Sequence, residues 1–441
     1  MAELLRLPTA SRPVAASVDV PGSKSIANRA LVCAALAEGD SVLGNVPGGD
    51  DTVAMLDCLG RLGIPTDSAG TDTAGTDAAG TGAGDEVRVR GTGGRLDARG
   101  VTLDAALAGT TSRFVTALAA LAPGPITIDG GAPLRRRPMG PLHAALAELG
   151  ATVEPDGAPG CLPVTVRGPL RSGGTVAIAG DVSSQYLTAL MLIGPYLAGG
   201  LRLRLTTPLV SEPYVRLTAR VMAAFGVGGV TIGPGEITVP EGRYAATELV
   251  IEPDASSASY PLAMAAVAGG RVQVRGLHRT SAQGDVAFAD LLADMGCTVE
   301  DHPDGIAVAR AAAEPLTGID VDMADISDLV PTVAVVAVTA TTPTTISGVG
   351  FIRGKESDRL GDLAAELGTL GAHVEVLPDG LRIVPGPALH GATLGTHHDH
   401  RLAMAFGVLG TVVPDIVVAD PGVVSKSWPG YWDVRRRILG A

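Results

Sequence analysis

The sequence is poor in aromatic residues and in basic charge, and each shortage excludes a class of function. Phe, Trp and Tyr make up 3% of the 441 residues, so the chain offers few flat side chains on which nucleic-acid bases could stack. Its 33 basic and 46 acidic residues give a formal charge of -13, whereas nucleic acid and anionic membranes bind to basic surfaces. We therefore expect any anionic ligand to be small and to be held by a local basic cluster.

Cysteine and long apolar runs are also scarce. The four cysteines are far apart and show no close pairing, which indicates reduced thiols in the core rather than a disulfide framework or a zinc site. The longest uncharged apolar stretch, Tyr186 to Leu201, falls short of the ~18 residues that span a membrane. The N-terminal residues have the features of neither a signal peptide nor a transit peptide. We expect a cytoplasmic protein with four buried thiols, Cys33, Cys58, Cys161 and Cys297.

Six copies of one pattern follow one another along the chain, which is longer than a single hydrophobic core usually supports. Each copy contains a helix-like stretch that ends in Leu-Gly or a close variant, and glycine supplies the left-handed conformation that ends a helix. Successive closing glycines are 87, 76, 70, 75 and 69 residues apart, an interval that predicts six structural repeats. These glycines are Gly63, Gly150, Gly226, Gly296, Gly371 and Gly440.

Each repeat contains a second, apolar helix, opened by small or polar residues that can cap its free N–H groups. A strand-like stretch such as residues 126–130 (ITIDG) follows it, so the predicted unit is βαβαβ. Since the sixth copy ends with a helix at the C-terminal end, the N-terminal strand would complete it, and one domain would be discontinuous. The predicted helix openings are Ser23, Gly109, Ser183, Ser256, Ser327 and His398.

The long first interval has a visible cause. Three related pentapeptides, TDSAG, TDTAG and TDAAG, run from Thr66 to Gly80 without an aromatic or basic residue. This composition is typical of a flexible insertion. We expect residues 66–86 to form a flexible loop without a chemical role.

The chemically informative residues occupy two equivalent places in the repeats: the start of the apolar helix and the loop after its strand. Helix starts carry unpaired N–H groups and a partial positive charge, so hydroxyls and cations there favour phosphate or carboxylate. Arginine binds these anions with two parallel hydrogen bonds, whereas lysine is a mobile point charge that can also shuttle protons. The helix-start residues are Lys24, Ser25, Arg29, Thr110, Arg113, Ser183, Ser184, Gln185, Asp399, His400 and Arg401, and the loop residues are Arg135, Arg136, Arg137, Ser211, Tyr214, Lys355, Glu356, Asp358, Arg359 and Lys426.

Taken singly, these features have simpler explanations. The sequence PGSKS around Lys24 lacks the frame of a phosphate-binding P-loop, and three consecutive arginines most often form a solvated turn. The sequence from His397 to His400 invites a metal site, but adjacent side chains point in different directions and no further ligand follows at a recognisable spacing. We predict no metal ion. Recurrence at matching positions of successive repeats is the reason to interpret these residues together.

Nine segments in order resemble the signatures of 5-enolpyruvylshikimate-3-phosphate synthases across nearly the whole chain. The resemblance implies an α/β fold of two domains, each with three repeats in an inside-out α/β barrel, and a ligand cleft between them that closes on binding. The expected domains are residues 1–20 plus 253–441, which hold both chain ends, and residues 21–252. The segments are PGSKSIANRAL, AGTTSRF, LRRRPMGPL, SSQYLTAL, SEPY, DASSASY, IRGKESDRL, HDHRLAMAF and SKSWP.

The family transfers the enolpyruvyl group of phosphoenolpyruvate to the 5-hydroxyl of shikimate 3-phosphate and releases phosphate, by addition and then elimination. By resemblance, shikimate 3-phosphate would contact Lys24, Ser25, Arg29, Ser183, Ser184, Gln185, Ser211, Tyr214, Asp328 and Lys355. Phosphoenolpyruvate would contact Lys24, Gly109, Thr110, Arg137, Gln185, Arg359, Arg401 and Lys426.

The resemblance also implies roles in proton transfer. Asp328 would accept the hydroxyl proton, while Glu356 and Lys24 would handle the methyl proton and the leaving group. No metal and no organic cofactor are implied, since arginines and lysines neutralise the charge of the intermediate. We expect a monomer whose partners are the two small substrates, with no nucleic acid and no membrane.

Three positions depart from the family pattern. Leu107 stands where members commonly have Asn, and Phe351 replaces another frequent Asn four residues before Lys355. Phe114 occupies a position where some members have Pro beside the phosphoenolpyruvate site. The first two replacements put an Asn-mediated substrate contact in doubt, and the third bears on the response to inhibitors.

Two other functions fit parts of the sequence. Related transferases that act on UDP-N-acetylglucosamine share the six-repeat fold, but they usually carry a reactive Cys where this chain has Ala132, and Asn where it has Ser25. An inert binder of anionic metabolites would explain the basic residues alone. Carboxylates such as Asp328 and Glu356 weaken anion capture, however, and proton transfer explains their presence better.

Overall fold

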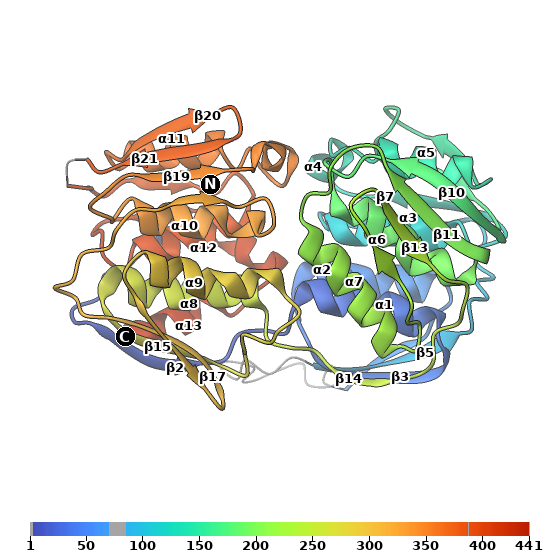
Figure 1. Ribbon diagram of the computed structural model, residues 1–441, viewed down its shortest axis with the longest axis horizontal. Helices are drawn as coiled ribbons and strands as arrows, with labels where there is room; N and C mark the ends of the chain where they lie inside the picture. Colours follow the sequence, from blue (N-terminus) through green and yellow to red (C-terminus); the bar gives the residue numbers. More distant parts are fainter. Residues whose placement is uncertain (1–2, 70–84, 387, 441) are drawn as a thin grey trace. The chain divides into compact units, whose positions relative to one another are not determined.

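A computed structural model describes residues 3–69, 85–386 and 388–440. These residues group into two compact units (Figure 1). Unit 1 comprises residues 3–21 and 252–440 and includes the yellow to red part of the chain, whereas unit 2 comprises residues 22–69 and 85–251 in blue to green.

Unit 2 contains three four-stranded sheets, with strand orders β14-β3-β5-β4, β6-β7-β9-β8 and β10-β11-β13-β12. Its strands are β3 (Glu38–Val46), β4 (Thr66–Ala69), β5 (Asp85–Thr92), β6 (Val101–Asp104), β7 (Pro125–Asp129), β8 (Thr152–Pro155), β9 (Val164–Arg167), β10 (Ser172–Ile178), β11 (Ala198–Leu205), β12 (Thr231–Ile232), β13 (Glu236–Val239) and β14 (Glu248–Val250). Its helices are α1 (Lys24–Leu36), α2 (Asp50–Arg61), α3 (Gly109–Ala119), α4 (Ala132–Arg135), α5 (Gly140–Glu148), α6 (Ser184–Ile193), the 3-10 helix η1 (Gly194–Tyr196) and α7 (Glu212–Ala224).

Unit 1 contains two four-stranded sheets, β16-β17-β15-β2 and β18-β19-β21-β20, and the three-stranded sheet β1-β23-β22. Its strands are β1 (Leu4–Arg6), β2 (Val14–Val18), β15 (Gly270–Arg275), β16 (Thr298–His302), β17 (Gly305–Arg310), β18 (Asp320–Asp322), β19 (Thr344–Ser347), β20 (His373–Leu377), β21 (Gly380–Val384), β22 (Thr393–Gly395) and β23 (Val417–Ala419). Its helices are α8 (Ala255–Ala268), α9 (Phe288–Asp294), α10 (Val330–Ala337), α11 (Gly361–Thr369), α12 (His400–Leu409) and α13 (Tyr431–Leu439), with 3-10 helices η2 (Gly284–Ala287), η3 (Ser327–Leu329), η4 (Gly350–Gly354) and η5 (Pro421–Lys426).

A complete repeat has six main elements, as the second repeat of unit 2 shows. Strands β6 and β7 are parallel and joined through α3, and β9 is antiparallel to both β7 and β8. The unit is therefore βαβαββ, and the predicted βαβαβ was one strand short. The cause is a turn-rich segment, PDGAPGCLP at residues 155–163, which divides the last β-rich stretch into a hairpin.

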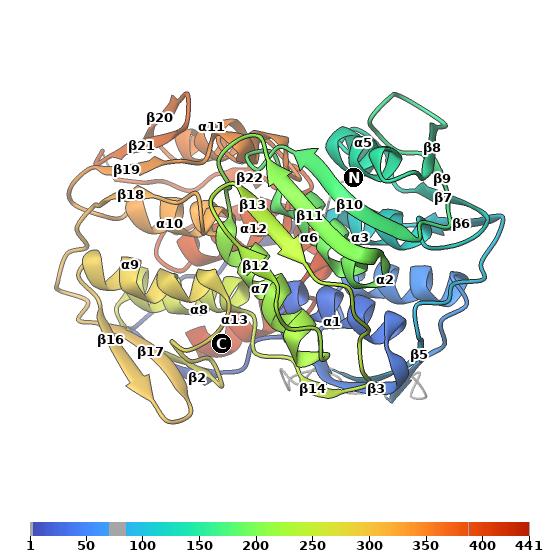
Figure 2. The same ribbon diagram turned by 45° about the vertical axis from the view of Figure 1, so that its right-hand side comes forward.

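The apolar helices form the interior of each unit. In unit 2, α1, α3 and α6 contact one another, and in unit 1, α8, α10 and α12 do so. Most residues of these helices are buried, including all of α12. Figure 2 shows strands β10, β11 and β13 of unit 2 side by side across α6 and α3. The sheets thus flank a helical core, and among the described residues no sheet closes on itself as a barrel.

The six closing glycines confirm the predicted helix ends. All six have positive φ, between 72° and 104°, a conformation that glycine adopts without the steric cost of a side chain. They follow α2, α5, α7, α9, α11 and α13.

Strands distant in sequence complete three of the sheets. β1 pairs antiparallel with β23, as predicted for the N-terminal strand and the sixth repeat. β2 pairs parallel with β15, and β14 pairs parallel with β3. The first repeat of each unit therefore takes its first strand from a segment outside the rest of that repeat.

Three predicted helix starts and one predicted loop were wrong. α10 begins at Val330, after the 3-10 helix η3 that starts at the predicted Ser327. α8 begins at Ala255 with Asp254 as its cap, and α12 begins at His400 with Asp399 as its cap, because each carboxylate accepts a backbone N–H of the first turn. Of the predicted loop 66–86, residues 66–69 form β4 and residues 85–86 open β5, with Val87 facing Ser68 across the pair. Residues 70–84 lie outside the described residues.

The burial of the four cysteines and the length of the helices test two further expectations. Cys33, Cys58 and Cys297 are free and buried, whereas Cys161 is only half-buried, because it lies in the turn between β8 and β9. Across the stretches that the structure covers, no helix has both the length and the apolar character needed to cross a membrane.

Candidate active site

A cluster of charged side chains in unit 1 surrounds Asp328, which lies in η3 before α10. Its Oδ1 accepts hydrogen bonds from Lys355 Nζ at 2.6 Å and from Arg359 Nη1 at 2.9 Å. Its Oδ2 accepts one from Arg401 Nη2 at 2.7 Å. Sequence segments 27, 31 and 73 residues away from Asp328 thus converge on one carboxylate.

Arg359 is the centre of this cluster and is buried. Its Nε donates to Asp399 Oδ2 at 2.7 Å, and its Nη2 donates to Glu356 Oε2 at 2.9 Å. With the bond to Asp328, the guanidinium connects three carboxylates. The side chains of Arg359 and Asp399 are 1% and 0% exposed, so each neutralises a charge that would otherwise be costly to bury.

Burial and charge act in opposite directions on Asp328. Burial alone would raise its pKa, but the charges of Arg401, Lys355 and Arg359 hold the pKa well below its usual range. Burial lowers the pKa of Lys355 despite the opposing charge of Asp328. Asp328 is therefore ionised at neutral pH and can accept a proton, whereas Lys355 loses its proton more readily than a solvated lysine.

Local hydrogen bonds fix the loop that carries this cluster. The carboxylate of Asp358 accepts from the backbone N–H groups of Leu360 and Gly361 at 3.2 and 3.0 Å, at the start of α11. The carboxylate of Asp399 accepts from the N–H of Arg401 at 2.9 Å and so caps α12. Both acids therefore order the backbone as well as binding arginine.

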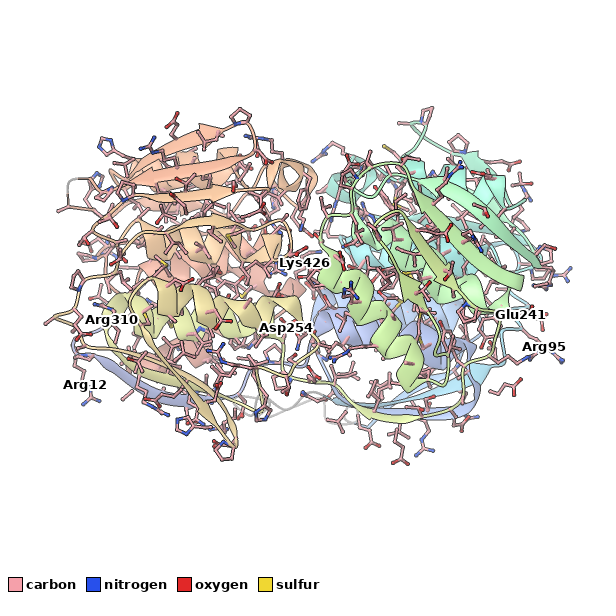
Figure 3. All side chains as sticks on the ribbon, in the orientation of Figure 1. Arg12, Arg95, Glu241, Asp254, Arg310 and Lys426 are labelled. Carbon is pink, nitrogen blue, oxygen red and sulfur yellow. The ribbon has the colours of Figure 1, made fainter. Side chains whose placement is uncertain are left out.

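Lys426 belongs to the same unit but to another element. It ends η5 and is 6% exposed. Figure 3 labels Lys426 and also Asp254, which caps α8.

In unit 2, Arg29 connects helices α1, α6 and α7. Its Nε donates to Thr218 Oγ1 at 2.9 Å, and its other nitrogens donate to the carbonyls of Ser25 at 2.7 Å and Tyr214 at 3.2 Å. A longer contact of 3.4 Å reaches Thr188 Oγ1. Burial lowers the pKa of Arg29 to about 10, and the residue remains a cation at neutral pH.

Lys24, the first residue of α1, is ion-paired within unit 2. Its Nζ lies 2.9 Å from Asp51 Oδ2, and the two side chains are 16% and 4% exposed. Asp51 lies in the first turn of α2, where the helix dipole favours a negative charge, and its carbonyl accepts from Thr111 Oγ1 at 3.0 Å. Helices α1, α2 and α3 therefore begin close together.

The start of α3 meets the arginine-rich loop. A Cβ added at Gly109 would lie 2.5 Å from Arg137 Nη1 and 2.7 Å from Arg113 Nη1, so a side chain there would require both guanidinium groups to shift. Arg113 donates to the carbonyl of Gly109 at 2.8 Å and to that of Pro138 at 3.1 Å. It therefore holds the residue after Arg137 against the helix start.

The serine-rich starts of α6 and α7 contribute further groups to unit 2. Gln185 Nε2 donates to Thr110 Oγ1 at 3.2 Å, and Ser183 caps α6 by accepting from the N–H of Gln185. Ser184 opens α6 and is buried. Ser211 caps α7 in the left-handed conformation, with φ of 54°, a strained backbone of the kind that clusters at binding sites.

The predicted site residues thus fall into two groups, one in each unit. Comparison with known proteins shows the family of the chain. The sequence pattern of the EPSP synthase family (3-phosphoshikimate 1-carboxyvinyltransferase) matches residues 8–434. The chain belongs to the EPSP synthase family.

Relatives and a solved structure agree with this assignment. The chain is 42% identical to a 3-phosphoshikimate 1-carboxyvinyltransferase of Nostoc punctiforme, covering 98% of both chains. It is 41% identical to one of Methanosphaerula palustris, covering 96% of both. It also shares its fold with an EPSP synthase of Acinetobacter baumannii, with a TM-score of 0.80 at 24% identity over 99% of this chain and 98% of that one.

Two of the three residues that depart from the EPSP synthase pattern place an aromatic ring beside a cation. Phe114 is buried, and the guanidinium carbon of Arg29 lies 5.7 Å from its ring centre. Lys355 Nζ lies 5.8 Å from the ring centre of Phe351. Both aromatic rings therefore support a cation of the site. Leu107 is 43% exposed in the turn before α3.

The His-rich segment does not converge on a common point. His397 Nε2 lies 2.7 Å from Glu366, and His398 Nδ1 lies 3.6 Å from Asp420. His400 is buried beside Asp399. Over residues 3–69, 85–386 and 388–440, no group of three or more His, Cys, Asp or Glu side chains could hold a metal ion.

Three acidic residues were not among those expected to contact a substrate. Asp51 pairs with Lys24, Asp399 pairs with Arg359, and Asp285 lies within electrostatic reach of Asp328. Asp51 and Asp399 each lie at a helix start; Asp399 was among the helix-start residues named from the sequence, but Asp51 was not. Asp285 offered no such signal, because its relation to Asp328 depends on the packing of separate repeats.

Proposed function

We propose that this protein transfers the enolpyruvyl group of phosphoenolpyruvate to the 5-hydroxyl of shikimate 3-phosphate and releases phosphate, a step of aromatic amino acid biosynthesis. The family assignment supports the reaction. The observation that carries it is the ionised Asp328 beside Lys355, Arg359 and Arg401. A carboxylate among cations is suited to accept a proton from a substrate whose anionic groups those cations bind.

Shikimate 3-phosphate, in this proposal, contacts hydroxyl, amide, acidic and basic side chains. The hydroxyls of Ser183, Ser184 and Ser211 with the cation Arg29 suit a polyhydroxy phosphate, because helix starts favour the phosphate and hydroxyls exchange hydrogen bonds with the ring. Gln185, Tyr214 and Ser25 complete this set. Asp328 and Lys355 meet the hydroxyl that reacts.

Phosphoenolpyruvate carries a carboxylate and a phosphate, and two sets of cationic groups suit these anions. Arg137 and the start of α3 form one set, and Arg359, Arg401 and Lys426 form the other. Because Arg359 and Arg401 are bonded to carboxylates, substrate anions would compete for these donors. The cations are thus held in place before the substrate arrives, which reduces the cost of ordering them.

The chemistry follows as addition and elimination. Asp328 accepts the proton of the 5-hydroxyl. The oxygen of that hydroxyl bonds to C2 of phosphoenolpyruvate, while C3 gains a proton. Phosphate then leaves the tetrahedral intermediate as C3 loses a proton. Glu356 and Lys24 are assigned to these later transfers, and the surrounding arginines stabilise the negative charge of the intermediate.

The test is phosphate release from phosphoenolpyruvate by purified protein with shikimate 3-phosphate, with UDP-N-acetylglucosamine or without an acceptor. Release with shikimate 3-phosphate alone supports the proposal. Release with the nucleotide sugar alone would assign the protein to the related transferases. Binding of phosphoenolpyruvate without release in any mixture would leave an inert binder of anions.

We also propose a cytoplasmic monomer that needs neither metal nor organic cofactor. The acidic composition and dispersed thiols support the location. Light scattering during size-exclusion chromatography should give a mass near 44.3 kDa, and a value near twice that mass would refute the monomer. Activity should survive dialysis against a chelator, because cations of the chain bind the substrate anions, and a loss restored by a divalent ion would refute the metal-free reaction.

A further inference from the structure

Unit 1 contains a cavity of about 500 Å³ that has no part in the reaction scheme above. Strand β1, the 3-10 helix η5 and helix α13 supply most of its lining. Pockets that hold small organic ligands typically have volumes of about 300–1,000 Å³. The cavity is therefore large enough for a small organic molecule, and every residue that lines it belongs to unit 1.

Apolar side chains form much of the wall of this cavity. Leu7 and Val424 are each 3% exposed. The ring of Trp432 is held in place, because its Nε1 donates to the carbonyl of Pro421 at 3.0 Å. Such a wall favours a ligand with an apolar body, since contact between the two removes apolar surface from water. The apolar lining residues include Leu5, Leu7, Pro8, Pro421, Val424 and Trp432.

The cavity is also lined by a buried cation, Arg435 of α13, which is 1% exposed. Its Nε donates to the carbonyl of Gly407 and its Nη2 to that of Pro8, each at 2.7 Å. Among the described residues, no atom accepts a hydrogen bond from its third nitrogen, Nη1. The two carbonyls thus fix the orientation of the guanidinium, and the N–H groups of Nη1 suit a carboxylate oxygen.

The other charged residues of the lining lie at its exposed edge. They are Glu3, Arg6 and Arg436. Arg6 and Arg436 each pair with an aspartate that does not line the cavity, and these pairs are open to solvent. Exposed pairs of this kind interact weakly with other charges. Arg435 is therefore the group that decides which charge the cavity prefers, and it favours an anion.

We propose that this cavity binds a small organic anion, with a carboxylate bonded to Arg435 and an apolar body against Trp432 and the neighbouring apolar side chains. Its lining includes none of the residues assigned to the two substrates, so the inference does not depend on the proposed function. η5 forms one wall of the cavity and ends at Lys426. The bound molecule therefore lies beside the element that carries a proposed ligand of phosphoenolpyruvate.

The first test is isothermal titration calorimetry of the full chain with two probes of similar shape, 2-naphthoate and the uncharged 2-naphthalenemethanol. We expect 2-naphthoate to bind at least about tenfold more tightly, because only its carboxylate forms a charge-assisted hydrogen bond with Arg435. Equal affinities, or no binding of 2-naphthoate, would overturn the inference. This comparison uses wild-type protein, so it does not depend on how any variant folds.

A variant that fills the cavity shows where 2-naphthoate binds. Gly422 lines the cavity, and a Cβ added there would meet open space. We expect Gly422→Phe to weaken the binding of 2-naphthoate at least about tenfold, because the phenyl ring takes the space that the ligand needs. The matched control is Gly368→Phe in α11, where an added Cβ also meets open space but the residue does not line the cavity.

Circular dichroism of both variants is the control for folding. Gly368→Phe should keep the wild-type affinity for 2-naphthoate. An unchanged affinity in folded Gly422→Phe would place the probe elsewhere, such as on the cations around Asp328, and would overturn the inference. So would an equal loss of affinity in both variants.

Discussion

Replacing Arg359 with methionine tests the charged cluster that holds the loop after η4 to α12 and η3. Methionine fills similar volume but removes every hydrogen bond from the guanidinium, including those to Asp399 and Asp328. Asp399, whose side chain is 0% exposed, would then be buried without its cation. Breaking a buried pair in this way typically costs about 3–5 kcal/mol, and we expect Arg359→Met to lower the free energy of unfolding of unit 1 by that amount.

The assay is urea unfolding followed by tryptophan fluorescence. The chain has two tryptophans, and both Trp428 and Trp432 pack against Tyr431 in unit 1, so the signal reports on that unit. The matched control is Arg6→Met. Arg6 pairs with Asp415 at 2.8 Å, but their side chains are 72% and 69% exposed, and such pairs contribute at most about 1 kcal/mol.

A double variant separates the lost ion pair from other effects of the substitution. Adding Asp399→Asn to Arg359→Met removes the unpaired buried charge, so the double variant should be more stable than the sum of the two single changes predicts. Equal destabilisation by Arg359→Met and Arg6→Met would refute the reasoning. So would strict additivity of the two substitutions in the cluster.

Three further predictions follow from the same geometry. Asp328→Asn should lower kcat by about 10²–10⁴, as expected for loss of a general base, with the urea midpoint as the control for folding; activity within a few-fold of wild type would contradict the role. Asp51→Asn should raise KM for both phosphoenolpyruvate and shikimate 3-phosphate about tenfold, because it removes the carboxylate that holds Lys24 in place and both substrates are expected to contact Lys24; unchanged KM values for both substrates would refute this. Burial and then Arg113 lower the pKa of His143 to about 4, so the unfolded chain binds this proton first as pH falls, and stability should drop by about 3 kcal/mol between pH 6.5 and 4. His143→Leu should make that loss of stability smaller, as measured by chemical unfolding followed by circular dichroism at each pH. An unchanged pH dependence of the stability would contradict the prediction.

The repeat was readable in the sequence because its signals are local. Gly63 and the five equivalent glycines end their helices through their own backbone conformation, which no distant residue needs to supply. The apolar spacing likewise identified the six inner helices. The exact start of α8 was less certain, since Asp254 and Ser256 are both suitable caps and only the backbone decides between them.

The fourth strand of the five four-stranded repeats, which in the first repeat is β4, was not predicted from the sequence. Thr66 to Ala69 has the composition of a loop, yet it pairs with β5, whose alternating Val87 and Val89 are buried. An edge strand gains its stability from its neighbour and needs little apolar content of its own. Composition alone therefore underestimated the sheet.

For the site, the sequence identified residue types at helix starts but not their partners. The bond between Arg359 and Asp399 joins residues 40 positions apart, and that between Lys24 and Asp51 spans 27. Such pairs depend on how repeats pack, which no periodicity encodes. The resemblance named Lys24 and Arg359 as ligands of substrate, whereas the structure adds the acids that hold them.

The most direct test of the central claim is mass spectrometry of the acceptor after incubation of the protein with phosphoenolpyruvate and shikimate 3-phosphate, with released phosphate measured in the same sample. We predict an acceptor that carries one enolpyruvyl group, formed in equal amount to phosphate, and formation of this product about 10²–10⁴ times more slowly with Asp328→Asn. Unmodified shikimate 3-phosphate after full reaction time, with or without hydrolysis of phosphoenolpyruvate, would contradict the account.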